Sequence, residues 1–218
     1  MASFDRFVDR VTRVTPAGAA LVLGFGLVPG LNLVSGALLA LVVLLRGYVK
    51  AALVGGAAVI GLAAIGWALG QEPLRVLIEP LGGPLLATWV PVVLLAVILR
   101  SSRSLALMVA VGTLAASLVV IGQLVLIAEP ILFWQHLLAQ ALEPIKSFRG
   151  FGDVPWQKTI VAMARLMPGV SAAGLLLAAV AMVLTGRYAQ ARLLRPGAFG
   201  DEFRRLSMGR IVTVVASL

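Results

Sequence analysis

Long apolar runs, each ended by basic residues, Pro or Gly, are the feature that most limits how this chain can fold. They cover residues 17–45, 51–69, 85–99, 105–128 and 170–185. A helix needs about 20 residues to cross the roughly 30 Å hydrocarbon core of a bilayer. Hydrophobic residues make up 61% of the chain and charged residues 12%, whereas soluble domains are about half apolar and about a quarter charged. The sequence therefore predicts an all-α, polytopic transmembrane bundle of about six helices, forming a single integral membrane domain over 1–218.

The first apolar run, 17–45, is interrupted by the sequence Val28-Pro29-Gly30-Leu31-Asn32. Because Pro removes a helix hydrogen bond and Gly and Asn favour turns, this run is either a helical hairpin or one broken helix. Cytoplasmic loops of membrane proteins carry an excess of Lys and Arg. A hairpin that follows a cytoplasmic amino terminus over 1–16 puts most of the 18 basic residues on the cytoplasmic side, so the charge pattern favours the hairpin.

The rest of the chain is then expected to alternate between the membrane and its two faces. Transmembrane helices are predicted over 51–69, 85–99, 105–128 and 168–186, a basic cytoplasmic loop over 187–210, and the start of a further, truncated helix over 211–218. The outer segment 129–158 has apolar residues at helical spacing but too many polar ones for a span. Trp and Phe favour the membrane interface, so an amphipathic helix is expected there over 131–142.

Several function classes are not expected from this composition. The chain has no Cys and a single histidine, His136, so no cluster of thiolates or imidazoles is available for a metal, and no cofactor is expected. No nucleophile elbow accompanies His136, so an enzyme is not expected either. The formal net charge is +9, but the basic residues lie between apolar runs instead of along one face, which argues against nucleic acid as a partner.

Polar side chains within or beside predicted spans are costly in lipid and are therefore candidate ligand-binding residues. Gln123 lies in a predicted span, and Trp134 and His136 follow on the outer side, where the three could line a pocket for a small molecule. The alternative is a purely structural role, in which Gln123 bonds a neighbouring helix, Trp134 anchors at the interface and His136 is solvated. This role is favoured because aromatic residues at the membrane interface are common. Asn32 in the first turn and Arg165 complete the candidate set, although Arg165 can instead extend to lipid headgroups.

The segment that begins at Gly186, GRYAQARLLRPGAFGDEFRRL, carries a more specific pattern. Its distinctive residues are Arg187, Tyr188, Gln190, Pro196, Gly197, Phe199, Glu202, Phe203 and Leu206. This pattern resembles the YybS-like family of predicted bacterial membrane proteins, for which no activity is established. The resemblance implies a multi-pass protein of the bacterial inner membrane, with a plan similar to that of the substrate-binding subunits of energy-coupling factor transporters.

Two functions are compatible with these features. The first is transport-related binding of a small molecule from the outer face; the alternative is a membrane scaffold that recruits a cytoplasmic protein partner through its basic loop. Arginines beside phenylalanines suit either anionic lipid headgroups or a protein surface. The candidate docking residues of this loop are Arg187, Tyr188, Arg195, Pro196, Gly197, Phe199, Glu202 and Phe203. Membrane lipids are expected to surround the chain in both cases.

Overall fold

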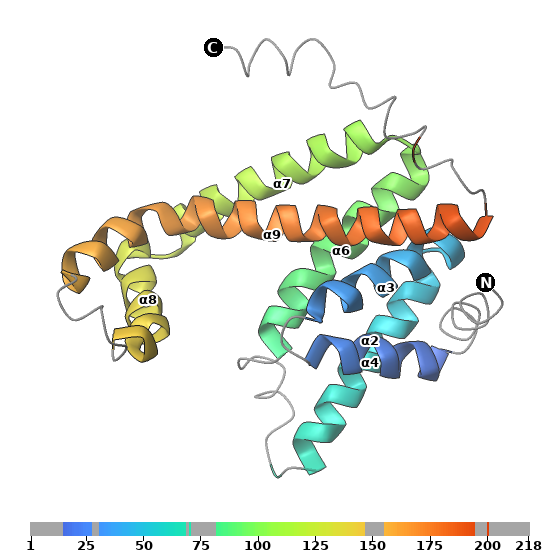
Figure 1. Ribbon diagram of the computed structural model, residues 1–218, viewed down its shortest axis with the longest axis horizontal. Coiled ribbons are helices and arrows are strands. Elements are labelled where there is room, and N and C mark those ends of the chain that lie inside the picture. Colours follow the sequence, from blue (N-terminus) through green and yellow to red (C-terminus); the bar gives the residue numbers. More distant parts are fainter. Residues whose placement is uncertain are drawn as a thin grey trace. The chain divides into compact units, whose positions relative to one another are not determined.

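The computed structural model describes residues 15–27, 31–68, 70, 82–146, 155–194 and 200, and these ranges contain helices and no strand. In chain order the helices are α2 (Thr15–Leu27), α3 (Asn32–Arg46), α4 (Tyr48–Ala68), α6 (Gly82–Ser102), α7 (Leu105–Leu126), α8 (Pro130–Lys146) and α9 (Trp156–Leu194) (Figure 1). The predicted all-α class is confirmed for the described residues.

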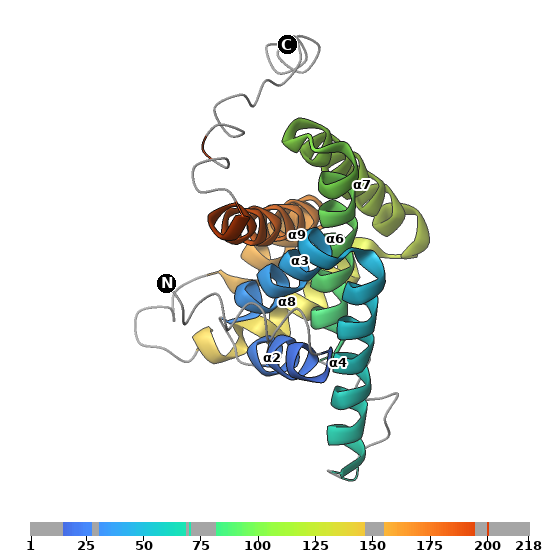
Figure 2. The same cartoon turned by 90° about the vertical axis from the view of Figure 1, so that its right-hand side faces the viewer.

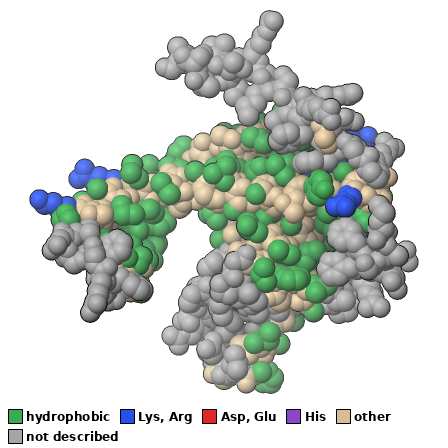
Figure 3. Space-filling model, viewed as in Figure 1, with side chains coloured by type: hydrophobic (Ala, Val, Ile, Leu, Met, Phe, Trp, Pro, Cys, Tyr) green, Lys and Arg blue, Asp and Glu red, His purple; other side chains and the backbone are tan. Residues whose placement is uncertain are grey.

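Three of the described helices, α4, α7 and α9, are long and apolar enough to cross a membrane, while α3 and residues 87–102 of α6 are shorter apolar helices. On the face drawn in Figure 3, hydrophobic side chains cover much of the described surface, and Lys and Arg side chains occur in only a few places. These helices indicate that the chain associates with a membrane. The number of about six spanning helices stays a prediction.

The chain divides into two compact units. Unit 1 consists of Met1–Gly112 and Leu177–Leu218, and unit 2 consists of Thr113–Leu176. Unit 1 therefore contains α2, α3, α4 and α6 with the beginning of α7 and the end of α9. Unit 2 contains the remainder of α7, all of α8 and the beginning of α9.

Helix α3 forms the centre of unit 1. Its residues 35–44 are buried without interruption, as expected for a helix that is hydrophobic on all sides. It contacts α2, α4 and α6, which lie around it in both ribbon views (Figures 1 and 2). The end of α9 also packs on α3, where a Cβ built on Gly186 would lie 3.0 Å from the carbonyl oxygen of Ala37. The absence of a side chain at Gly186 thus permits the two helices to approach closely.

The first apolar run forms two helices, α2 and α3, that contact each other; residues 28–30 between them are outside the described part. A buried hydrogen-bonded group ties this pair to α6. The Ser35 hydroxyl donates to the carbonyl oxygen of Val22 at 2.8 Å, and the indole N–H of Trp89 donates to the Ser35 oxygen at 3.0 Å. Because buried polar groups are costly when unpaired, this arrangement fixes how α2, α3 and α6 pack.

The last described helix is longer at both ends than the predicted span 168–186, which it contains. Helix α9 begins at Trp156, not at residue 168, and contains Pro168 in its interior. It also continues to Leu194, so residues 187–194 are helical and the expected loop does not begin at 187. The residues on both sides are good helix formers, mainly Ala, Leu, Met, Arg and Gln, which explains the extension. The amphipathic helix expected over 131–142 corresponds to α8, and residues 195–199 and 201–218 lie outside the described part.

Candidate functional site

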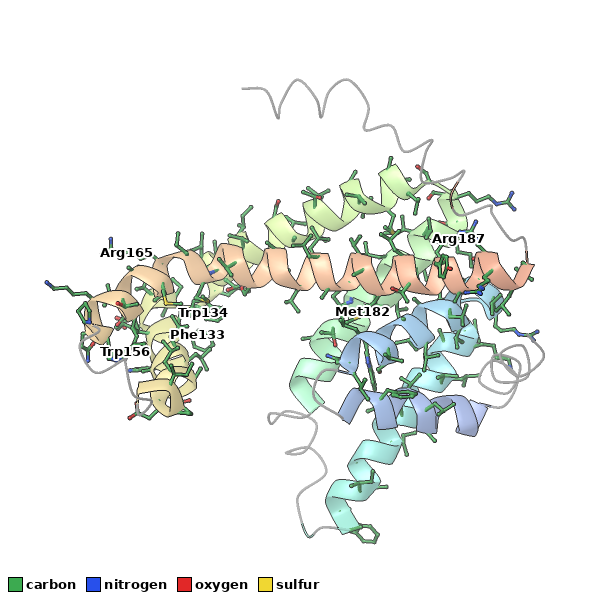
Figure 4. All side chains as sticks on the ribbon, in the orientation of Figure 1. Phe133, Trp134, Trp156, Arg165, Met182 and Arg187 are labelled. Carbon is green, nitrogen blue, oxygen red and sulfur yellow. The ribbon has the colours of Figure 1, made fainter. Side chains whose placement is uncertain are left out.

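Two of the predicted outer-site residues contact each other in unit 2. The indole N–H of Trp134 on α8 donates to the Gln123 side-chain oxygen on α7 at 3.3 Å, and the Trp134 ring meets Phe133 edge-to-face at 5.6 Å (Figure 4). His136 is exposed on the same helix. The Gln123 oxygen is therefore engaged by Trp134, as the structural alternative expected, and ligand binding at these residues stays a prediction.

The other two candidate ligand-binding residues lie in different units. Asn32 is in unit 1, where its buried side-chain oxygen has no hydrogen-bond partner among the described residues. Arg165 is exposed on the unit 2 portion of α9. It borders an open groove of about 380 Å³ lined by Gln157, Lys158, Val161, Ala162 and Arg165. The described contacts therefore do not join the five candidates into one site.

Only two of the predicted docking residues belong to the described part of the chain. Arg187 and Tyr188 lie on α9, where the Tyr188 side chain is 50% exposed. The others, Arg195, Pro196, Gly197, Phe199, Glu202 and Phe203, are outside the described residues. Arg187 instead belongs to a cavity that the sequence does not reveal.

This cavity, which we call the arginine pocket, has a volume of about 320 Å³ and lies within unit 1. It is lined by Leu44, Leu99, Arg100, Arg103, Arg187 and Gln190. Leu44 is near the end of α3, Leu99 and Arg100 are near the end of α6, and Arg187 and Gln190 are near the end of α9. The guanidinium groups of Arg100, Arg103 and Arg187 thus line one cavity, at the ends of α3, α6 and α9 and the link between α6 and α7. Arg187 is labelled in Figure 4.

The Arg100 guanidinium is held by the end of α3. Its Nη1 donates to the carbonyl oxygens of Val43 and Leu44 at 2.7 and 2.8 Å. The Val43 carbonyl also accepts from the Gly47 N–H at 2.9 Å, whereas the Leu44 carbonyl is among those that a helix leaves without a backbone partner at its C-terminus. Gly47 lies against the guanidinium, since a Cβ built there would be 3.7 Å from Arg100 Cζ. Gly47 has a φ of 92°, a conformation that Gly adopts at little cost.

Gln190 and Arg187 extend this hydrogen-bonded group along α9. The Gln190 side-chain nitrogen donates to the Leu44 carbonyl oxygen at 3.1 Å, and Arg187 Nη1 donates to the Gln190 side-chain oxygen at 2.6 Å. The Leu44 carbonyl therefore accepts from both Arg100 and Gln190. These bonds orient two of the three guanidinium groups before any ligand is present, which reduces the ordering cost of binding.

Arg103 reaches the pocket from an unusual backbone conformation. Its φ is 54°, the one positive φ of a non-glycine residue in the described part of the chain. Its N–H donates to the Leu99 carbonyl oxygen at 2.9 Å, closing the last turn of α6. Gly is the usual residue at such a helix end, and an L-residue pays about 1–2 kcal/mol to be there. An arginine at this position therefore lowers the stability of the chain relative to Gly, which suggests that its side chain has another role.

The electrostatics of the arginine pocket favour an anion. The described residues of unit 1 include no Asp or Glu. The C-terminal ends of α3 and α6 supply about half a negative charge each, which offsets part of the positive charge of the arginines. From the sequence, Arg187 is predicted to lie in a docking loop, and nothing distinguishes Arg100 or Arg103 from the other basic residues. The sequence shows basic residues after several apolar runs, but it does not show which of these residues lie close together in the folded chain.

Comparison with protein-family models, with curated proteins and with solved structures finds no match. The resemblance to the YybS-like family stays a prediction. The geometry of the described residues, above all of the arginine pocket, is therefore the basis for a functional proposal.

Proposed function

We propose that this chain is a multi-pass inner-membrane protein that binds a small, negatively charged molecule in the arginine pocket, in a transport-related role. The observation that carries this proposal is the convergence of three arginines on a cavity of about 320 Å³, within a unit whose described residues include no carboxylate. The volume is at the lower end of the range typical of small-molecule sites, about 300–1,000 Å³. It suits a small molecule or a headgroup.

The charge pattern of α9 supports a membrane crossing with the pocket at its cytoplasmic end. Residues 166–186 are free of charge between Arg165 and Arg187. In a helix this stretch is about 31 Å long at about 1.5 Å per residue, close to the roughly 30 Å of a hydrocarbon core. Arg100, Arg103 and Arg187 are on the cytoplasmic side in the topology that the positive-inside tendency favours. The proposed ligand is therefore exchanged with the cytoplasm, not with the outer face.

The proposed topology can be tested directly because the chain has no Cys. We expect a membrane-impermeant maleimide applied to intact spheroplasts to label Gln140→Cys on α8 and to spare Ser104→Cys beside Arg103. Permeabilised cells are the control and should allow both positions to react. Labelling of Ser104→Cys in intact spheroplasts would contradict the cytoplasmic position of the pocket.

Ligand binding is tested by native mass spectrometry of the protein extracted gently in detergent. We expect an anionic small molecule or lipid to accompany the wild-type chain and to be lost from Arg103→Gln. Arg192→Gln is the matched control, because Arg192 is exposed on α9 and does not line the pocket. A wild-type chain that carries no anion would contradict the proposal and favour the scaffold alternative, in which the basic segment after α9 recruits a cytoplasmic partner.

A further inference from the structure

We infer that a groove at the beginning of α9 binds the headgroup of an anionic phospholipid. This groove, which we call the α9 groove, has a volume of about 380 Å³ and is lined by Gln157, Lys158, Val161, Ala162 and Arg165. All five residues belong to the unit 2 part of α9, so the inference does not depend on the arginine pocket of unit 1. It goes beyond general solvation by lipid, because it assigns one class of lipid to one place on the chain.

Lys158 and Arg165 lie on the same side of α9. Lys158, Ala162 and Arg165 are four and then three residues apart, a spacing that puts them on one side of a helix. The other side is packed, since Ile160 is 5% exposed and Ala164 is 0% exposed. The two cationic residues are about 10 Å apart along the helix axis, and a helical side chain leans toward the N-terminus, so Arg165 extends back toward Lys158. A phosphate beside Ala162 can therefore accept hydrogen bonds from both.

Both cations are available to a ligand. Lys158 and Arg165 are exposed, and in the part of the chain that the structure describes neither side chain has a hydrogen bond or an ion pair. Ammonium and guanidinium groups form strong hydrogen bonds with phosphate oxygens. Two positive charges favour a lipid whose phosphate is not neutralised by an ammonium group of its own. Phosphatidylglycerol is therefore expected to bind more tightly than phosphatidylcholine.

The position of the α9 groove along the helix corresponds to the level of lipid headgroups. Residues 166–186 carry no charge, so Arg165 is the last charged residue before a stretch that is long enough to cross a bilayer. Trp156 precedes the groove, and Trp favours the headgroup region. Both residues are labelled at the same end of α9 in Figure 4. The molecules that meet two cations at this level of a membrane are phospholipids.

The surface of α9 that follows the groove suits acyl chains. Gly169 continues the side that carries Ala162 and Arg165, and a Cβ built on Gly169 would have no neighbour within 4 Å. Leu166 and Val170 beside it are 67% and 54% exposed. The cationic groove is thus followed by open apolar surface, as a site for an amphipathic molecule requires. A soluble phosphate compound makes no use of that surface.

The test measures lipid binding to the full-length protein in detergent by native mass spectrometry, during titration with phosphatidylglycerol or with phosphatidylcholine of the same acyl chains. We expect phosphatidylglycerol to bind roughly tenfold or more tightly than phosphatidylcholine. Lys158→Gln and Arg165→Gln should each weaken phosphatidylglycerol binding about fivefold, since one basic residue near anionic lipid contributes about 1 kcal/mol. Arg192→Gln is the matched control, because it removes an exposed charge at the other end of α9, and it should bind as the wild type does.

Two further variants separate a shared site from two cations that extend independently to headgroups. Ala162→Leu fills the groove between Lys158 and Arg165 without changing the charge, and because Ala162 is exposed it should leave stability unchanged. We expect it to weaken phosphatidylglycerol binding as the single charge variants do. The double exchange Lys158→Arg, Arg165→Lys keeps both charges and should retain tight binding. Phosphatidylglycerol affinity equal to wild type in Ala162→Leu would overturn the shared site.

Each remaining outcome overturns the inference. Equal affinity for the two lipids removes the selectivity, and unchanged phosphatidylglycerol binding in the double variant Lys158→Gln, Arg165→Gln removes the groove. Displacement of the lipid by glycerol 3-phosphate in the same concentration range identifies a soluble phosphate compound as the ligand. Binding that appears only in Asp153→Asn means that a carboxylate of this chain occupies the groove. Phosphatidylglycerol binding that is lost in Arg103→Gln and kept in the double variant places the lipid in the arginine pocket, which leaves the proposed function intact.

Discussion

Units 1 and 2 each contain a tryptophan whose indole N–H donates to a polar side chain on another helix. In unit 1, Trp89 on α6 donates to Ser35 on α3, and both residues are buried, with Trp89 only 4% exposed. In unit 2, Trp134 on α8 donates to Gln123 on α7 and both are half-buried. The same donor, an indole N–H, is thus bonded to a buried hydroxyl in one unit and to a half-buried amide oxygen in the other.

A similar contrast in burial separates α3 in unit 1 from α7 in unit 2. Residues 35–44 of α3 are buried by their neighbours in unit 1, whereas α7 in unit 2 exposes a series of large apolar side chains, namely Leu114, Leu118, Val119, Ile121, Leu124, Val125 and Leu126. Exposed apolar surface of this extent is unusual in a soluble monomer. Protein packing thus encloses the middle of α3, whereas lipid is the expected solvent for the exposed side chains of α7 and equally for those of α4 in unit 1, such as Ile60 and Trp67.

The largest expected effect tests whether the exposed face of α7 lies in lipid. Leu114 is near the middle of α7 and 62% exposed. Leu114→Asp should disfavour membrane insertion by about 3 kcal/mol, since that is the cost of Asp at the centre of a spanning helix. Insertion of α7 into microsomes, scored with engineered glycosylation sites, measures the change. Leu126→Asp at the helix end is the milder control. If Leu114→Asp leaves insertion unchanged, this face of α7 is in contact with water, and the expectation that it lies in lipid is contradicted.

The second prediction concerns two glycines of α9, one in each unit. Gly186 in unit 1 lies against α3, and its added Cβ would be 3.0 Å from Ala37 backbone and from Ala40 Cβ; Gly174 in unit 2 has no neighbour within 4 Å of that position. Gly186→Leu should therefore destabilise the chain by about 2–3 kcal/mol through overpacking. Gly174→Leu should change stability little. Unfolding by SDS in mixed micelles measures both, and equal losses would contradict the difference in packing.

The fold class was predictable because hydrophobic length is a local property. Apolar runs with basic ends predicted helices, and α4, α7 and α9 contain such runs. The limits of α9 were not predictable from Pro168, since a proline inside a helix in lipid is tolerated when neighbouring groups satisfy the freed carbonyl. The burial of α3 was not predictable either, because several of the other helices are about equally apolar.

The candidate site was less predictable than the fold for a related reason. Arg100 and Arg187 are far apart in the sequence and meet only because α6 and α9 end beside α3. Basic residues at the ends of the apolar runs are visible in the sequence, but the positive-inside tendency already explains them. They therefore do not by themselves indicate a binding site. By contrast, the expected contact between Gln123 and another helix could be anticipated, since a polar group in a span needs a nearby partner.

The third prediction addresses the buried indole pair of unit 1. Ser35→Ala removes the acceptor of the Trp89 N–H and the hydroxyl that donates to Val22. An unpaired buried donor costs about 1–3 kcal/mol, so we expect a loss of about 2 kcal/mol in the free energy of unfolding in SDS. Ser35→Thr is the conservative control, because it keeps a hydroxyl at this position while adding one methyl group. A stability equal to wild type in Ser35→Ala would mean that the group does not fix the packing of α2, α3 and α6.

The smallest effect is expected at the corresponding pair of unit 2. Gln123→Ala removes the acceptor of the Trp134 N–H, but that N–H is on a half-buried residue and can find water or a lipid carbonyl at the interface, where Trp is favoured. We therefore expect a change of about 0.5 kcal/mol or less, the low end for a replaceable hydrogen bond. Both this variant and Ser35→Ala remove the acceptor of an indole N–H. The difference between their losses in stability therefore measures the effect of burial. A loss as large as that of Ser35→Ala would show that further protein encloses this pair, either another segment of this chain or a second molecule.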